Sequence, residues 1–314
     1  MDIIAVLSQE LSVPKTQIES AVKLMDEGNT IPFIARYRKE VTGGLDDTIL
    51  RNLEERLHYL RNLEKRKQEV LELIAASGKL DDKQMEQMQK ALEEAKMLSE
   101  VEDLYRPYKQ KRKTRASVAR EKGLEPLAKF MLMQKPGGDL EQEAARYINA
   151  EKGVEDVEQA LSGAGDILAE EISDSAQIRS RLREYLQKNA QISTTKGTKE
   201  NQIYDMYSEY SESVRRIAPH RILAIDRGER EEALKVSVEI DQQICVGMIE
   251  NQVIHRNSPF AKALHEVCED SFKRLIFPSL ERELRAQLTE KACAQAIGVF
   301  SENLKNLLMQ PPVK

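Results

Sequence analysis

The chain contains no tryptophan, and its aromatic residues make up only 5% of 314 residues. Large buried aromatic clusters are therefore not expected. Because no run of roughly 18 apolar residues occurs, we expect no membrane-spanning helix. The first residues, MDIIAVLSQEL, carry an acid early and lack both a basic segment and a small-residue cleavage site. They do not have the character of a signal peptide.

Cysteine is also scarce, and the three that occur lie far apart in the sequence: Cys245, Cys268 and Cys293. An odd number of distant cysteines fits reduced thiols better than a disulfide framework. We therefore expect a cytoplasmic protein. With 32% charged and 40% hydrophobic residues and a mean hydropathy of −0.55, the composition is typical of a surface-rich helical protein.

Catalytic motifs are missing as well. The sequence has neither a GxxxxGK[ST] phosphate loop nor a GxSxG nucleophile motif, and Gly163-Ala164-Gly165 falls inside a helical pattern. His265 and Cys268 share one helix face, but a zinc site needs about four ligands and no second pair stands nearby. Helix capping explains the acidic pairs Asp46/Asp47 and Asp81/Asp82. We expect no enzyme, metal or cofactor.

What the sequence does contain is helical periodicity, which predicts an all-α, multihelical fold with more than half of the residues in helices. We divide the chain into three regions, 1–78, 79–200 and 201–314. Strand is expected only near 233–254, where residues 235–240 alternate and residues 244–249 are candidates for a second short strand. Residues 189–202 are polar and are expected to form a loop, followed by a helix over 204–217.

A helix-turn-helix unit is predicted near the start of the chain. Gly28-Asn29-Thr30 separates two short helical patterns, and Thr30 can cap the second. Four residues are expected on the buried side of that second helix: Ile31, Phe33, Ile34 and Tyr37. Three cations fall largely elsewhere and form a candidate nucleic-acid contact: Arg36, Arg38 and Lys39.

The net charge of −5 alone argues against nucleic acid, but the charges are unevenly distributed. Residues 101–135 hold ten basic side chains against four acidic ones, which leaves a net charge of +6 there and −11 elsewhere. Five of these cations can neutralise phosphates and two tyrosines can stack on bases: Lys109, Lys111, Arg112, Lys113, Arg115, Tyr105 and Tyr108. The alternatives are a solvated basic turn with both tyrosines packed on neighbouring helices, or an internal partner for the acidic remainder.

A third group of cations flanks Gly228 in HRILAIDRGEREEALKV: Arg221, Arg227 and Arg230. They form either an anion-facing turn or ion pairs with the neighbouring glutamates, and the neighbouring acids favour the ion pairs.

Three blocks resemble the N-terminal region of the Tex (toxin-expression) family in sequence and order: TIPFIARYRKEVTGGLDD, LYRPYKQKRKTRASVAREKGLEPLA and HRILAIDRGEREEALKV. Tex proteins are transcription accessory factors that bind nucleic acid. The resemblance implies a chain that stops before the family's RNase H-like, helix-hairpin-helix and oligonucleotide-binding domains. It implies a non-catalytic scaffold contacting RNA or DNA without sequence preference, or the transcription or translation machinery. The alternative is a protein-interaction module whose basic patch binds an acidic partner.

Overall fold

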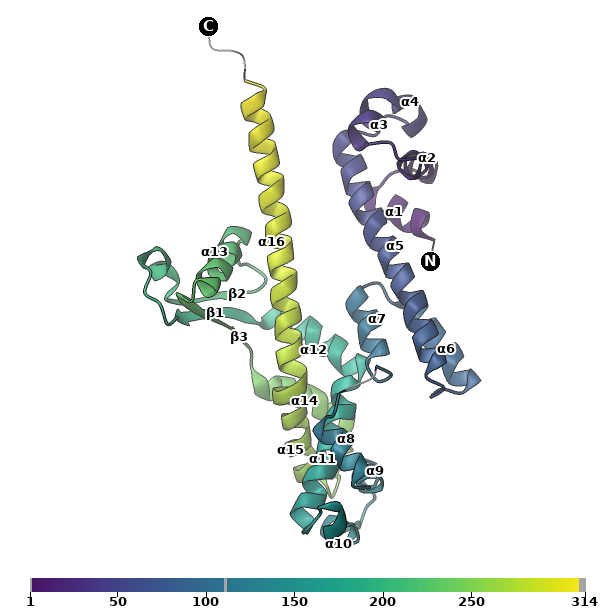
Figure 1. Ribbon diagram of the computed structural model, residues 1–314, viewed down its shortest axis with the longest axis vertical. Coiled ribbons are helices and arrows are strands. Elements are labelled where there is room, and N and C mark those ends of the chain that lie inside the picture. The colour runs from purple at the N-terminus through teal and green to yellow at the C-terminus, as the bar shows by residue number, and fades with distance from the viewer. Residues whose placement is uncertain (1, 110–111, 311–314) are drawn as a thin grey trace. The chain divides into compact units, whose positions relative to one another are not determined.

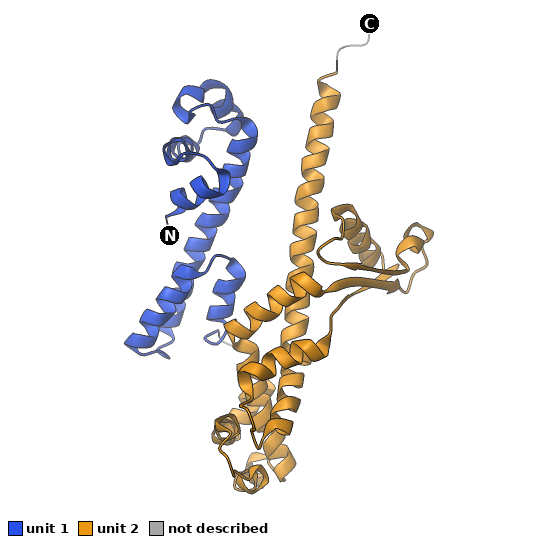
Figure 2. Cartoon of the chain, turned by 180° about the vertical axis from the view of Figure 1, so that it is seen from behind, with its two compact units in different colours: residues 1–110 blue, residues 111–314 orange. Residues whose placement is uncertain are grey.

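The computed structural model describes residues 2–109 and 112–310, and helices hold 71% of the residues. Figure 1 shows the helices and the small sheet, and Figure 2 shows the two compact units, residues 1–110 and 111–314. The predicted all-α class with a small β element is confirmed.

Among its described residues, unit 1 contains helices and their connections but no strand. Its elements are α1 (Ile3–Leu11), α2 (Lys15–Asp26), α3 (Ile31–Tyr37), α4 (Lys39–Thr42), α5 (Asp47–Ala76), α6 (Asp82–Glu94) and α7 (Leu98–Tyr105). Two of the predicted caps are confirmed, because the Asp46 carboxylate accepts from the Ile49 amide and the Asp81 carboxylate from the Gln84 amide, both at 2.8 Å. Gly78, at φ +62°, follows the end of α5.

The long helix α5 supports two successive hydrophobic clusters in unit 1. Its first half packs against α1 to α3, and its second half packs against α6 and α7. Lys67 interrupts the apolar stripe of α5, yet it is only 7% exposed. Its ammonium donates to the carbonyl of Glu93 at 3.1 Å and pairs with Glu64 at 3.1 Å. A cation at the last turn of α6 suits the negative end of the helix dipole.

Unit 2 begins with short helices and ends with a long one. Its helices are α8 (Arg115–Glu121), α9 (Glu125–Met133), α10 (Leu140–Ala145), the 3-10 turn η1 (Ala150–Lys152), α11 (Val157–Asp174), α12 (Ala176–Asn189), the 3-10 helix η2 (Gln202–Tyr207), α13 (Pro219–Arg230), α14 (Gln242–Val253), α15 (Ala261–Asp270), the π-helix η3 (Ser271–Ile276) and α16 (Phe277–Leu308). One hydrophobic cluster runs from α8 to α16 around α11.

Two glycines allow the helices of this cluster to approach α11 closely. A Cβ atom at Gly163 would clash with the side chain of Leu124, and one at Gly165 would lie 3.3 Å from Val267. Gly163-Ala164-Gly165 therefore lies inside a helix, as predicted, and its two glycines serve helix packing.

The sheet of unit 2 has three antiparallel strands in the order β2-β1-β3: β1 (Gln191–Lys196), β2 (Glu209–Ser213) and β3 (Leu234–Glu239). Ile192 pairs with Val238 on one side and with Glu212 on the other. The predicted strand near 235–240 is confirmed as β3.

Three other predictions in this region are wrong. Residues 191–196 form the central strand instead of a loop, residues 204–217 form η2 and β2 instead of a helix, and residues 244–249 lie in α14. The central strand β1 is rich in Ser and Thr, which are typical of loops. It nevertheless forms a strand because it pairs with β2 on one edge and with β3 on the other.

The two units also differ from the three predicted regions. The predicted boundary at 78/79 cuts through the cluster shared by α5, α6 and α7. The predicted boundary at 200/201 separates β1 from both of its partner strands.

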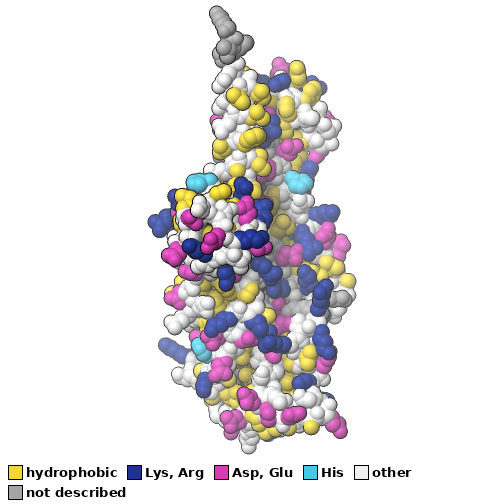
Figure 3. All heavy atoms as spheres, turned by 60° about the vertical axis from the view of Figure 1, so that its left-hand side comes forward, with side chains coloured by type: hydrophobic (Ala, Val, Ile, Leu, Met, Phe, Trp, Pro, Cys, Tyr) yellow, Lys and Arg dark blue, Asp and Glu magenta, His cyan; other side chains and the backbone are white. Residues whose placement is uncertain are grey.

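The second half of α16 is exposed, because every residue from 293 to 310 is open to solvent. Figure 3 shows hydrophobic side chains along this segment, just below the grey end of the chain. Within residues 2–109 and 112–310, no helix combines the length and the apolar character needed to cross a bilayer.

Candidate nucleic-acid interface

The two tyrosines predicted to stack on bases take part in the core of unit 1. Tyr105 and Tyr108 are half-buried and pack against the cluster between α5, α6 and α7. The Arg66 guanidinium lies 5.7 Å from the centre of the Tyr105 ring, and burial raises the pKa of Tyr108. This placement favours the alternative in which both rings are packed on neighbouring helices.

Several cations of residues 101–135 already have partners. Arg120 pairs with Glu170 at 2.8 Å, and Lys129 pairs with Glu125 at 2.8 Å. The Lys122 ammonium donates to the carbonyl of Gly153 at 2.7 Å. These side chains are therefore used within unit 2 and add little to an external positive surface.

The five cations of the predicted phosphate contact fall across the division between the two units. Lys111 lies outside the described residues, Lys109 belongs to unit 1, and Arg112, Lys113 and Arg115 belong to unit 2. Lys109, Arg112 and Lys113 are exposed, and among the described residues none of the three forms an ion pair with a carboxylate. They remain available to phosphate.

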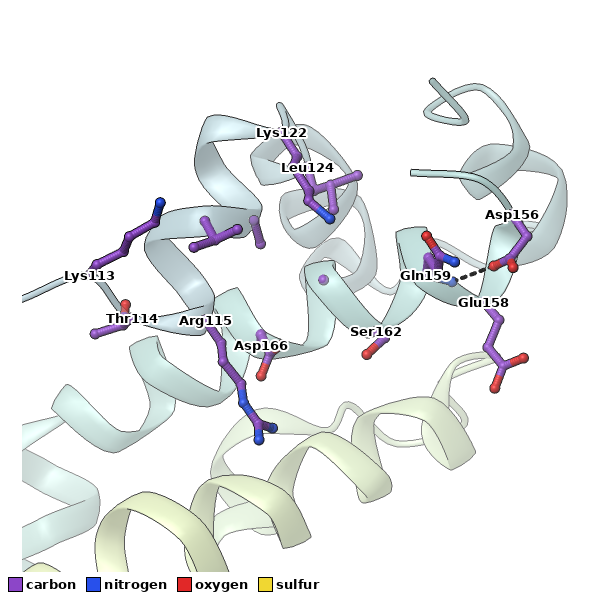
Figure 4. Close-up of a pocket in the computed structure, with 13 residues that line it drawn as sticks. Lys113, Thr114, Arg115, Lys122, Leu124, Asp156, Glu158, Gln159, Ser162 and Asp166 are labelled. Carbon is purple, nitrogen blue, oxygen red and sulfur yellow. Dashed lines mark hydrogen bonds between the residues drawn. The ribbon is translucent and has the colours of Figure 1, made fainter. Parts of the chain in front are cut away.

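Arg115 has a different environment from Lys113. Thr114 caps α8 by accepting from the Ser117 amide at 3.1 Å, and this fixes Arg115 in the first turn. Figure 4 shows Lys113 and Arg115 pointing apart, with Arg115 directed toward the space beside α11. Burial raises the pKa of Asp166, and the positive charges of Arg274 and Arg115 oppose that shift. The positive charge of Arg115 therefore acts on a carboxylate of its own unit.

The second predicted cluster lies on α3, Arg38 and α4. We define the α3–α4 surface by six of the exposed side chains there, Phe33, Arg36, Tyr37, Arg38, Lys39 and Val41; Pro32 and Glu40 are exposed beside them. The prediction that Phe33 and Tyr37 are buried is wrong, because their exposed fractions are 36% and 68%. The helix has only seven residues; Ile31 and Ile34 are buried, and Ala35 packs beside them partly buried.

The exposed rings of the α3–α4 surface stand together with a cation. The ring centres of Phe33 and Tyr37 are 5.4 Å apart, and the Arg38 guanidinium lies 5.3 Å from the Phe33 ring. Such spacing is typical of aromatic and cation–π pairs. Arg36, Arg38 and Lys39 form no ion pair among the described residues, although Glu40 lies beside them in the sequence. Helical periodicity assigned the two rings to the core, so the sequence analysis did not identify them as candidate binding residues.

The connection before α3 has the predicted glycine. Residues 27–30 join α2 to α3, with Gly28 at φ +82°. Thr30 occupies the N-cap position, but its side chain accepts no capping hydrogen bond. The order of helix, short connection and helix is present, and its use as a DNA-reading helix-turn-helix stays a prediction.

Two of the three cations around Gly228 form ion pairs, and Arg230 is exposed without one among the described residues. Arg227 pairs with Glu231 at 2.9 Å, as the ion-pair interpretation expects, whereas Arg221 pairs with Glu212 of β2 at 2.8 Å. His265 contacts Glu250, and Cys268 is buried. Within the described ranges, no three His, Cys, Asp or Glu side chains are grouped so that they can hold a metal ion.

Comparison with known families matches two parts of the chain. Residues 1–75 match the model of the Tex-like protein N-terminal domain, and residues 135–300 match the Tex central region-like model. The chain belongs to the Tex family. The two matches leave residues 76–134, with most of the basic segment, between them.

Relatives of this Tex-family chain align along nearly its whole length. It is 45% identical over 313 residues to the Bacillus subtilis protein YdcI, covering 98% of this chain and 43% of that protein. It is 42% identical to the transcriptional accessory protein Tex of Neisseria gonorrhoeae, covering 99% and 42%. The human S1 RNA-binding domain-containing protein 1 is 34% identical, covering 99% and 32%. The chain thus spans about two-fifths of the length of the bacterial relatives it matches.

Proposed function

We propose that this Tex-family chain supplies a non-catalytic surface that binds nucleic acid without sequence preference, as part of a transcription accessory protein in the cytoplasm. The observation that carries the proposal is the α3–α4 surface, where three cations without ion pairs among the described residues adjoin two exposed aromatic rings. The names of two relatives, a transcriptional accessory protein and an S1 RNA-binding domain-containing protein, support it.

The side chains of the α3–α4 surface are suited to binding single-stranded nucleic acid. Arg36, Arg38 and Lys39 neutralise phosphates, and Tyr37, the more exposed ring, stacks on a base. Stacking on an aromatic side chain contributes about 1–3 kcal/mol per base and does not depend on the base identity. Lys109, Arg112 and Lys113 provide further phosphate contacts of the same sequence-independent kind.

The test compares two triple variants of this chain with the same change of charge. Arg36→Ala/Arg38→Ala/Lys39→Ala removes the α3–α4 cations. Arg51→Ala/Arg61→Ala/Lys90→Ala removes three exposed cations of unit 1 that are paired with Asp47, Asp26 and Glu86. Binding of a labelled single-stranded oligonucleotide is followed by fluorescence anisotropy over a range of salt concentrations.

The first variant is expected to flatten the log–log salt slope by about two units, since each phosphate contact contributes about 0.7 on single strands. The control variant keeps the slope. Tyr37→Ala weakens single-strand binding by roughly tenfold and duplex binding much less. Equal losses of oligonucleotide affinity in the two triple variants would contradict the proposal, because the total charge of the chain would then explain the binding.

A parallel test addresses the basic segment. Replacing Lys111, Arg112 and Lys113 with Ala is expected to flatten the salt slope by about two units while the helix content stays unchanged. Unchanged binding in both this variant and the α3–α4 variant favours the alternative role, a module whose cations bind an acidic protein partner.

A further inference from the structure

Unit 2 carries a groove beside α11 that the proposed nucleic-acid surface does not use. Two hollows of about 720 Å³ each lie on either side of this helix and share Arg115, Glu158, Ser162 and Asp166. The first lies between α8 and α11 and is shown in Figure 4. The second, which we call the acidic groove, lies between α11 and α15 and is completed by α9 and α10.

The lining of the acidic groove is apolar at several positions. Five apolar side chains from α9, α11 and α15 contribute to it: Met131, Val157, Leu161, Ala263 and Val267. The groove follows α11 from Val157 to Asp166, ten residues that span about 15 Å of helix. That length matches two to three turns of a second helix.

The charged lining has one dominant sign. Five carboxylates and a single cation, Arg115, line the acidic groove. Arg274 of the π-helix pairs with Asp166 at 2.9 Å and with Asp270 at 2.5 Å, so these two carboxylates already share a cation within the unit.

Three carboxylates then remain for an external cation: Glu141, Glu158 and Glu266. Each is exposed, and none forms an ion pair within the parts of the chain that the structure describes. Figure 4 shows Glu158 pointing away from α8, toward the α15 side of α11. Carboxylates gathered in one hollow repel one another and raise the local concentration of a cationic ligand.

We propose that the acidic groove binds a basic amphipathic helical segment of a partner protein. Its apolar side chains enter the hollow along Leu161 and Val267, and its Lys or Arg side chains meet Glu141, Glu158 and Glu266. This is the helix-in-groove mode of peptide recognition. The negative charge repels phosphate, so the groove is not a continuation of the nucleic-acid surface.

The experiment uses residues 1–314 and a fluorescein-labelled, amidated 12-residue peptide with Leu at positions 2, 5, 6 and 9 and Lys or Arg between them. A second peptide carries Glu at every Lys or Arg position. The groove variant is Glu141→Gln/Glu158→Gln/Glu266→Gln. The control variant, Glu54→Gln/Glu55→Gln/Glu72→Gln, removes three exposed carboxylates of α5 and gives the same change of charge.

The groove variant is expected to bind the basic peptide about tenfold more weakly, and the control variant within about twofold of the unchanged chain. Hydrogen exchange is expected to slow on residues 157–166 and 261–270 when the basic peptide binds. Equal weakening in both variants, protection elsewhere, or equally tight binding of the acidic peptide would overturn the proposal. The groove variant is expected to keep its oligonucleotide binding. A failure of the groove proposal can therefore be distinguished from a failure of the nucleic-acid proposal.

Discussion

The contact between α12 and α16 allows a quantitative prediction about stability. Three side-chain pairs join these helices at a constant separation of 100 residues: Arg179 with Ser279, Arg183 with Glu283, and Gln187 with Gln287. A constant separation means that the two helices run parallel along this contact. Arg183 and Glu283 form two hydrogen bonds, at 2.6 and 3.2 Å.

The energetic cost of breaking this pair follows from its burial. The side chain of Arg183 is 7% exposed and that of Glu283 is 22% exposed. Removing one partner of a buried pair costs about 3–5 kcal/mol, because the other charge stays in a poorly solvated place. Arg183→Met leaves the more accessible carboxylate and is expected to cost about 2–3 kcal/mol. Glu283→Met leaves the less accessible guanidinium without this carboxylate, at a cost of about 3–5 kcal/mol.

The double variant Arg183→Met/Glu283→Met is expected to be within about 1 kcal/mol of the unchanged chain, since apolar replacement of both partners removes the desolvation cost. Urea unfolding followed by circular dichroism gives the three free energies, and hydrogen exchange of residues 176–189 assigns the loss to α12. Additive costs of the two single changes would refute the reasoning, because they would mean that the two charges do not interact.

Three further predictions test other parts of the structure. Burial raises the pKa of Cys245 to about 11 and of Cys268 to about 12, so iodoacetamide at pH 8 should label the exposed Cys293 alone; comparable labelling of a buried thiol by mass spectrometry contradicts this. Gly197→Ala should destabilise the sheet, because the added Cβ atom would clash with the Glu232 carbonyl. Gly247→Ala in α14 is the matched control, because its Cβ atom meets no other atom within 4 Å. This second change should stabilise the folded chain by about 0.5–1 kcal/mol and so raise its melting temperature. The hydrogen bond with Glu250 raises the pKa of His265. The stabilisation from this pair is therefore complete below pH 6.5 and is lost as the pH rises through the higher folded value. The surface position limits it to about 1 kcal/mol, and Glu250→Gln should reduce this pH dependence of unfolding, which the charges of Glu266 and Glu269 also support.

Local signals were sufficient to predict most of unit 1. The acid at position 46, the long leucine stripe and the glycine at position 78 predict α5 nearly to the residue, because capping and periodicity act within a few residues of each other. In unit 2, β1 could not be predicted, since its stability comes from β2 and β3, whose paired residues lie up to 48 positions away, and its own Ser and Thr residues are typical of loops.

The candidate site shows a related limit. Periodicity assigned Phe33 and Tyr37 to the core, but this helix has only seven residues, and of its apolar side chains Ile31 and Ile34 are the fully buried ones. The reverse holds for Tyr105 and Tyr108, whose neighbours are basic and whose rings are nevertheless packed in a cluster. Sequence composition identifies which rings lie near cations, and tertiary packing decides which of them reach solvent.

A count of cations likewise overstates the positive surface of a segment. Arg120 and Lys129 are paired with acids, Lys122 donates to a carbonyl, and the positive charge of Arg115 acts on Asp166. The cations that stay open to an external anion are those without a carboxylate within reach, and the same criterion selects the open carboxylates of the acidic groove. A single net charge of −5 therefore covers two described surfaces of opposite sign, one on unit 1 and one on unit 2. Salt should weaken both interactions, but only the α3–α4 variant should change the oligonucleotide slope and only the groove variant the affinity for the basic peptide.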